Sequence, residues 1–134
     1  RGMGYDNQLR REKVCPVVEL FRYLSFVEGV AAAILNLLWE GAGHTSVVYT
    51  DDEKKAEYAG AELPVGRILV NQAGGAASGG NYINGLHPTM SLGCGSWGNN
   101  SISENLTYKH LMNVTKLAYY HDCTMPPFEE VWAL

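Results

Sequence analysis

Two glycine-rich segments are the first candidates for ligand binding. Residues 93–98 read Gly-Cys-Gly-Ser-Trp-Gly, the G-x-G-x-x-G spacing of a dinucleotide-binding turn, and residues 74–80 read Gly-Gly-Ala-Ala-Ser-Gly-Gly. A dinucleotide-binding turn follows a buried strand and opens an amphipathic helix, and a P-loop ends in Lys followed by Ser or Thr. Neither segment has these features. We therefore interpret residues 93–98 as a structural turn and residues 74–80 as a mobile or ligand-facing loop.

The three cysteines and four histidines could act as nucleophiles or metal ligands. Their spacing contains no C-x-x-C or H-x-x-x-H pair, so no metal site is predicted. Cys94 lies between two glycines, but the sequence offers no basic partner for it, and we expect a structural thiol. His44 follows a Gly-Ala-Gly segment and precedes a predicted strand, a position that favours a capping or core histidine. Glu12 lies within a run of basic residues, as in a solvated charged surface.

These residues belong to a predicted alternation of strands and helices. Ser25-Phe26-Val27-Glu28 has the S-x-x-E form of a capping box, so a helix should begin there and end at the glycines of residues 41–43. Asp51-Asp52 should cap a second, short helix that runs through Tyr58 and closes at Gly60. The predicted apolar face of the first helix consists of Phe26, Val30, Ala33, Ile34, Leu37 and Leu38, and the predicted strands are residues 16–23, 45–50 and 67–71.

This order predicts the α/β class, with a parallel βαβαβ unit. The pattern stops after Asn71, and residues 107–120 then alternate partly between polar and apolar side chains. We predict a terminal strand there that could dock a partner subunit. Residues 68–103 contain none of the 24 Asp, Glu, Lys and Arg side chains, which indicates that they are covered by other protein or line a cleft.

Length and composition exclude several classes of protein. The chain has 134 residues, with 46% hydrophobic and 18% charged side chains, which is typical of one globular domain. Its net charge of -4 argues against nucleic acid as a partner, and no apolar run approaches the roughly 20 residues of a membrane span. Three widely spaced cysteines favour a reducing compartment, so we expect a cytoplasmic protein. A chain that opens with Arg1 looks like the interior of a longer protein.

Four segments have distinctive sequences. Residues 11–17, 40–46, 66–72 and 92–106 read REKVCPV, EGAGHTS, GRILVNQ and LGCGSWGNNSISENL. They resemble the carboxyl-terminal part of the CoA-acylating aldehyde dehydrogenases, and the resemblance covers nearly the whole chain. It implies a partial catalytic domain in residues 1–103, and an oligomerisation strand with a carboxyl-terminal tail in residues 104–134. In detail the sequence looks most like the CoA-dependent succinate-semialdehyde dehydrogenases, with the acetaldehyde and sulfoacetaldehyde enzymes as alternatives.

The resemblance also implies roles for individual residues. Glu12 matches the glutamate that holds the nicotinamide ribose hydroxyls, and Val14 occupies a place where related enzymes often pack a phenylalanine near the nicotinamide. His44 matches the histidine of a Gly-His-Thr motif, which could donate a hydrogen bond or assist proton transfer near the nicotinamide and thioester. Residues 68–103 match a wall of the aldehyde pocket, to which we assign Asn71, Gly79 and Gly80.

The reaction implied is the reversible conversion of an aldehyde, CoA and NAD or NADP into an acyl-CoA and the reduced nucleotide. The nucleophilic cysteine of the family lies upstream of the matching region, so the resemblance implies that this chain alone is inactive. The implied partners are the remainder of the same enzyme and further copies of it, in a homodimer or larger homo-oligomer formed through the terminal strand. An alternative is a non-catalytic interaction or oligomerisation module.

Overall fold

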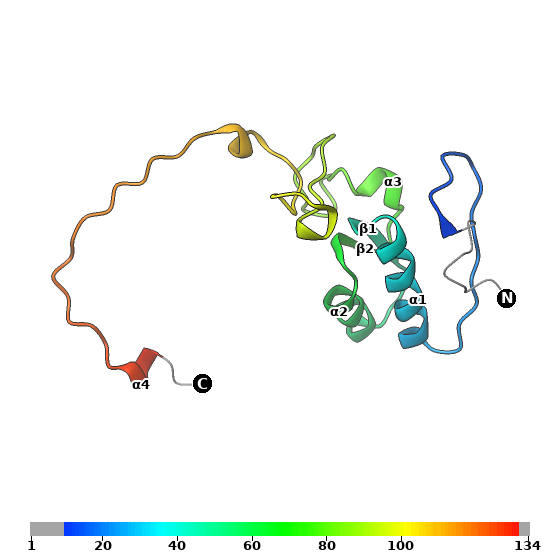
Figure 1. The fold of residues 1–134 in the computed structure, drawn as a ribbon, viewed down its shortest axis with the longest axis horizontal. Helices are drawn as coiled ribbons and strands as arrows, with labels where there is room; N and C mark the ends of the chain where they lie inside the picture. Colours follow the sequence, from blue (N-terminus) through cyan, green and yellow to red (C-terminus); the bar gives the residue numbers. More distant parts are fainter. Residues whose placement is uncertain (1–9, 132–134) are drawn as a thin grey trace.

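The computed structural model describes residues 10–131 (Figure 1). A small body of helices and strands is followed by a long segment that curves away from it. Residues 1–9 and 132–134, which complete the predicted domains 1–103 and 104–134, lie outside the described residues. The elements in chain order are α1 (Phe26–Trp39), β1 (Gly43–Val48), α2 (Glu53–Glu62), β2 (Val65–Val70), α3 (Gly74–Ala77), the 3₁₀ helices η2 (Ser96–Gly98) and η3 (Tyr108–Leu111), and α4 (Phe128–Val131).

Helix α1 begins at the predicted capping box. The Ser25 hydroxyl accepts the backbone N–H of Glu28 at 3.2 Å, and the Glu28 carboxylate accepts the N–H of Leu24 at 2.8 Å. The predicted apolar face is confirmed for Val30 and four partly buried neighbours, whereas Leu38 is 68% exposed. The helix stops before Gly41, which has a positive φ of 99°. A residue with a side chain would be unfavourable in that conformation.

The two strands form a parallel pair joined through α2. Gly43 lies opposite Val65 and Val48 lies opposite Val70, so the two strands start and finish at the same edges of the sheet. Helices α1 and α2 bury the core cluster Val30, Val48, Ala59, Leu63 and Val65. The βαβ part of the predicted α/β fold is therefore confirmed.

Helix α2 is longer than predicted. The Asp52 side chain caps it by accepting the N–H of Lys54 at 3.1 Å, as expected. It continues past Tyr58 to Glu62, because a helix tolerates an interior glycine such as Gly60 at a cost of about 1 kcal/mol. The ring that Pro64 carries then prevents continuation, and β2 begins at the next residue.

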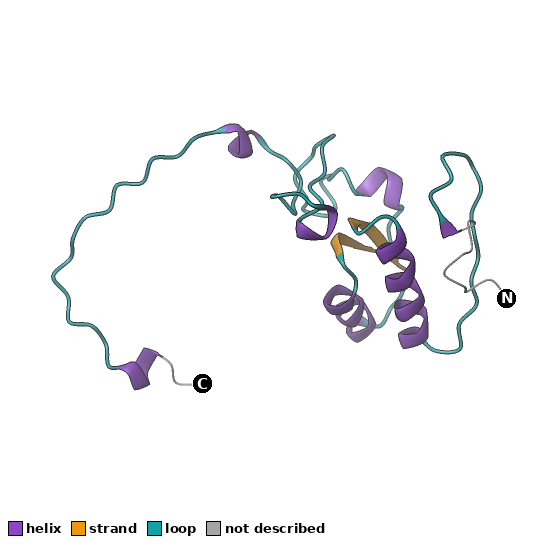
Figure 2. Cartoon of the chain, viewed as in Figure 1, coloured by secondary structure: helices purple, strands orange, loops and turns teal. Residues whose placement is uncertain are grey.

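Two predicted strands are not strands in the structure. Residues 16–23 run without sheet hydrogen bonds, and residues 112–127, here called the C-terminal arm, are irregular loop (Figure 2). A strand is stable only beside a hydrogen-bonding neighbour, and no strand in residues 10–131 pairs with either segment. The alternating side chains of the arm, including Val114, Leu117 and Tyr119, are left exposed. The terminal oligomerisation strand is therefore not confirmed.

The segment between α3 and η3 folds as packed loops. Leu92 and Asn105 form an isolated antiparallel bridge, and the N–H of Gly95 donates to the carbonyl of Ile102 at 2.9 Å. The chain therefore doubles back on itself beside the start of β1, where β1 contacts η2. None of the helices within residues 10–131 combines the length and apolarity that a membrane span requires.

Candidate functional site

A cavity of about 630 Å³ lies where the amino-terminal segment meets the end of α1 and the start of β1. Its lining includes both Glu12 and His44, which are 32 residues apart in the sequence. Two of the residues to which the resemblance gives a role near the nicotinamide therefore share one cavity. Among the described residues, no group of three or more His, Cys, Asp or Glu side chains is arranged to hold a metal ion.

Contacts with the last turns of α1 place Glu12 in this cavity. Its backbone N–H donates to the Glu40 carboxylate at 2.6 Å, and the Arg10 guanidinium donates to the Asn36 side-chain oxygen at 2.6 Å. The Arg11 guanidinium lies 5.7 Å from the centre of the Trp39 ring, within cation–π range. These contacts use the backbone of Glu12 and leave its carboxylate available to accept hydrogen bonds in the cavity.

His44 stands at the amino end of β1, and its neighbour in space is Cys94. The Cys94 sulfur lies 3.8 Å from Nδ1 of His44, within hydrogen-bonding range for sulfur. This contact could not be predicted from local sequence because the two residues are 50 positions apart. The glycines around them are the signal that could have revealed it, because residues without side chains allow two backbone segments to approach closely.

The other predicted site residues lie elsewhere. Val14 is 97% exposed and does not line the cavity. Asn71 follows β2 at the carboxyl edge of the sheet, roughly 16 Å from the level of His44 at about 3.3 Å per residue. Its side-chain amide makes two 2.9 Å hydrogen bonds to the backbone of Thr50. Gly79 and Gly80 contact the loop at residues 87–89, where a Cβ on Gly80 would lie 2.4 Å from the His87 carbonyl oxygen.

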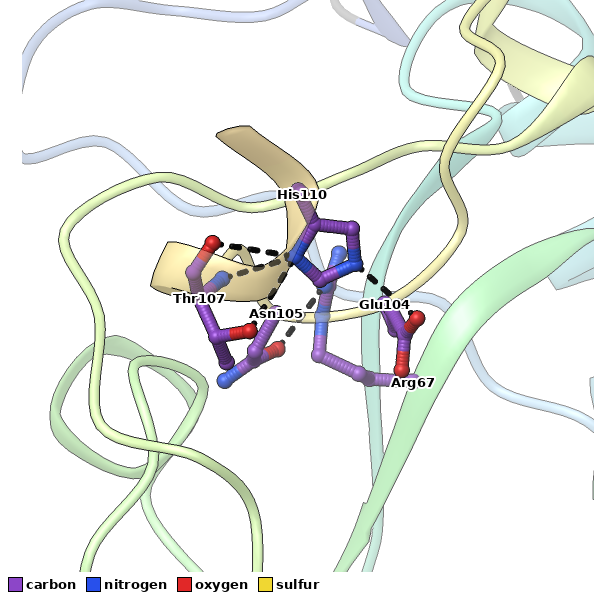
Figure 3. Close-up of polar contacts among 5 residues, drawn as sticks. All are labelled: Arg67, Glu104, Asn105, Thr107 and His110. Atoms are coloured by element: carbon purple, nitrogen blue, oxygen red, sulfur yellow. Dashed lines mark hydrogen bonds and ion pairs between the residues drawn. The ribbon is translucent and has the colours of Figure 1, made fainter. Parts of the chain in front are cut away.

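A buried arginine that the sequence analysis did not identify joins the sheet to the loops (Figure 3). Arg67 on β2 is 6% exposed and donates to the Thr45 hydroxyl at 3.1 Å, to the Asn105 side-chain oxygen at 3.1 Å and to the Gly93 carbonyl at 2.8 Å. Asn105 in turn donates to the Ser78 and His87 carbonyls. The turn at residues 93–98 is thus held against the strand that carries His44. A lone arginine inside an apolar strand is the sequence signal for such a group.

A second histidine, His110, makes hydrogen bonds just before the C-terminal arm begins. Nδ1 of His110 accepts the backbone N–H of Thr107 at 2.9 Å, and Nε2 lies 3.0 Å from the Glu104 carboxylate (Figure 3). An acceptor role for Nδ1 places the ring proton on Nε2, where it can donate to Glu104. This arrangement caps η3 and is separate from the cavity at Glu12.

No protein-family model matches the chain. The chain is nevertheless similar over nearly its whole length to CoA-acylating aldehyde dehydrogenases, which confirms the resemblance found in residues 11–17, 40–46, 66–72 and 92–106. It is 47% identical over 133 residues to the succinate-semialdehyde dehydrogenase (acetylating) of Clostridium kluyveri, an alignment that covers 98% of the chain and 29% of the relative. It is 41% identical over 124 residues to a sulfoacetaldehyde dehydrogenase of Acholeplasma sp, covering 91% of the chain and 25% of that relative.

A solved structure of the same class of enzyme is also similar to the chain. The crystal structure of a probable aldehyde dehydrogenase from Listeria monocytogenes EGD-e matches with a TM-score of 0.77 and 30% identity, over 91% of this chain and 26% of that one. The chain therefore spans less than a third of the length of the proteins it matches.

Proposed function

We propose that the chain supplies part of the nicotinamide and thioester site of a CoA-acylating aldehyde dehydrogenase. The observation that carries this proposal is the shared cavity, whose lining includes Glu12 from the amino-terminal segment and His44 from β1. In the reaction, an aldehyde, CoA and oxidised nucleotide give an acyl-CoA, the reduced nucleotide and a proton. The nucleophilic cysteine that forms the thioester belongs to the remainder of the enzyme, so this chain alone is inactive.

The two cavity residues have different roles in this proposal. The Glu12 carboxylate accepts two hydrogen bonds from the ribose hydroxyls of NAD or NADP, which holds the nicotinamide in register with the substrate. The bound nucleotide supplies the hydride acceptor. His44 donates a hydrogen bond to the thioester or aldehyde oxygen, or assists proton transfer there. Val14, which is exposed here, packs near the nicotinamide in the complete enzyme. Asn71, Gly79 and Gly80 contribute to the aldehyde pocket together with the remainder of the enzyme, because Asn71 lies too far from His44 to contact the same small aldehyde.

Succinate semialdehyde is the substrate that we propose. The 47% identity to a succinate-semialdehyde dehydrogenase supports it. Sulfoacetaldehyde is the alternative, because a sulfoacetaldehyde dehydrogenase is 41% identical. Both are short aldehydes that carry an anionic group at the far end, so the two differ in whether a carboxylate or a sulfonate must be accommodated.

The remainder of the same enzyme is the partner that we propose, and exposed surfaces support this. A cavity of about 490 Å³ is lined by residues of α1 and β1 and by neighbouring residues such as Tyr23 and Leu63. Side chains of the C-terminal arm such as Leu117 and Tyr120 are also largely exposed. A stable protein buries such surfaces. We propose that other parts of a cytoplasmic enzyme cover the first, and that a second copy covers the arm in a homo-oligomer.

The test uses the full-length enzyme that carries this sequence. Wild-type enzyme should oxidise NADPH or NADH in the presence of succinyl-CoA. Glu12→Gln should raise the KM for the nucleotide by about tenfold, because an amide oxygen accepts more weakly than a carboxylate. Glu57→Gln, an exposed carboxylate on α2 outside the cavity, is the matched control and should leave the KM unchanged. Equal kinetics for the two variants would remove Glu12 from the nucleotide site.

A non-catalytic interaction module is the second candidate, and the long arm with exposed apolar side chains favours it. Sedimentation of the isolated chain separates the two candidates. A defined, soluble oligomer supports the module, whereas aggregation supports a fragment whose apolar surfaces need the rest of an enzyme.

A further inference from the structure

The turn at residues 93–98 encloses one side chain, that of Cys94. A Cβ on Gly43 would lie 2.1 Å from the Cys94 carbonyl oxygen, and a Cβ on Gly98 would lie 2.4 Å from the Cys94 Cβ. The N–H of Cys94 also donates to the Asn100 side-chain oxygen at 3.1 Å. This close packing and the backbone hydrogen bond therefore fix Cys94, a residue that is 8% exposed, beside the start of β1.

The fixed thiol has two possible acceptors for its single proton. Nδ1 of His44 lies 3.8 Å from the sulfur, and the Leu92 carbonyl lies 4.0 Å from it. The His44 nitrogen is the nearer of the two. If the thiol donates to Nδ1, the proton of the neutral imidazole must sit on Nε2, because a neutral ring has one donor and one acceptor nitrogen.

We propose that Cys94 is a positioning residue for His44, which it holds in the tautomer that carries its proton on Nε2. This inference deepens the proposed function and rests on it, because it assigns His44 the role of hydrogen-bond donor to a substrate oxygen. Cys94 itself does not react: its thiol is enclosed and serves as a donor to the ring. On this proposal, the glycines of residues 93–98 allow the Cys94 thiol to approach the His44 ring and do not form a phosphate-binding turn.

The first test is structural and independent of activity. In full-length enzyme labelled with ¹⁵N-histidine, long-range proton–nitrogen NMR reports which ring nitrogen of His44 carries the proton, and His44→Gln identifies the signal. Wild-type enzyme should show an unprotonated Nδ1 and a protonated Nε2. Cys94→Ala should give a mixture of tautomers, and Cys94→Ser should largely restore the wild-type signal, because serine keeps a donor. A protonated Nδ1 in the wild type would overturn the proposal.

The second test is kinetic. Cys94→Ala should lower kcat about fivefold to tenfold, the range that a single hydrogen bond supplies, with the KM values for nucleotide and acyl-CoA nearly unchanged. Cys94→Ser should recover most of the loss. If Cys94→Ala does not fold, the tautomer of His44 in the wild-type enzyme still tests the proposal. Glu57→Gln, at an exposed residue of α2 outside the cavity, is the control. A Cys94→Ala enzyme with wild-type kcat would contradict the proposal.

A double-mutant cycle then asks whether Cys94 acts through His44. Adding Cys94→Ala to His44→Ala should cause no further loss of kcat, whereas two independent losses that multiply would overturn the positioning role. A failure of the proposed function would give a different result from a failure of the positioning role. In that case the wild-type enzyme does not reduce succinyl-CoA, and the tautomer of His44 still decides the role of Cys94.

Discussion

Replacement of Arg67 by methionine should loosen the packed loops beside β1. Methionine fills a similar volume without donors, so the Asn105 side-chain oxygen and the Gly93 carbonyl lose their partners. Asn105 is 4% exposed, and water cannot easily replace the guanidinium there. Each buried acceptor left without a donor costs about 1–3 kcal/mol, and the relief from burying a charge offsets part of the sum. We expect a net loss of about 3 kcal/mol.

Hydrogen–deuterium exchange in the full-length enzyme measures this loss where it occurs. The N–H groups of Gly93 and Gly95 donate to Glu104 and Ile102 at 3.0 and 2.9 Å, so their exchange reports opening of the loops. A loss of about 3 kcal/mol should speed their exchange about 150-fold, since each tenfold change corresponds to about 1.4 kcal/mol. Arg22→Met, at an exposed arginine, is the control and should leave exchange unchanged. An acceleration of less than about fivefold for Arg67→Met would refute the reasoning.

Two smaller predictions concern the ends of α2 and β2. Asn71→Ala should destabilise the carboxyl edge of the sheet by about 2 kcal/mol, because it removes two hydrogen bonds to Thr50 and places alanine at a φ of 55°. The loss should appear as faster hydrogen exchange of the Thr50 N–H, and an unchanged exchange rate would contradict the prediction. Asp52→Ala should cost about 1 kcal/mol through loss of the helix cap, measured as faster exchange of the Lys54 N–H. Asp51→Ala is its control, and equal effects of the two variants would show that the cap contributes nothing.

Local signals in the sequence predicted the parts of the fold that depend on near neighbours. The capping box at Ser25 and the cap at Asp52 each satisfy backbone groups within a few residues, so their residue types suffice to locate the starts of α1 and α2. The strand pattern of residues 16–23 and 107–120 indicates only a capacity to pair. Because the pairing partner of a strand lies elsewhere in the chain or in another molecule, alternation alone could not show that residues 10–131 offer neither segment a partner.

The candidate site likewise has a part that the sequence identified and a part that it did not. Glu12 and His44 were identified through a family resemblance, and their common cavity depends on the contact of the segment at residues 10–13 with the end of α1. Nothing in the spacing of the sequence specifies that contact. Arg67 and Cys94 were missed as interacting groups because the side-chain bonds of Arg67 and the contact of Cys94 with His44 span 22 to 50 positions, beyond the range of any local pattern.

The position of His44 at the amino edge of the sheet has a consequence for the rest of the site. Ligands of parallel α/β sheets gather at the carboxyl ends of strands, and Asn71 stands at that end, whereas His44 and Glu12 face a cavity at the other. Two strands of six residues separate the edges by roughly 16 Å. A single small aldehyde cannot contact both. If Asn71 shares a reaction with His44, an extended ligand or a segment from the remainder of the enzyme must connect the two edges, and kinetic effects of Asn71→Ala should then appear in the KM of that extended ligand and not in kcat.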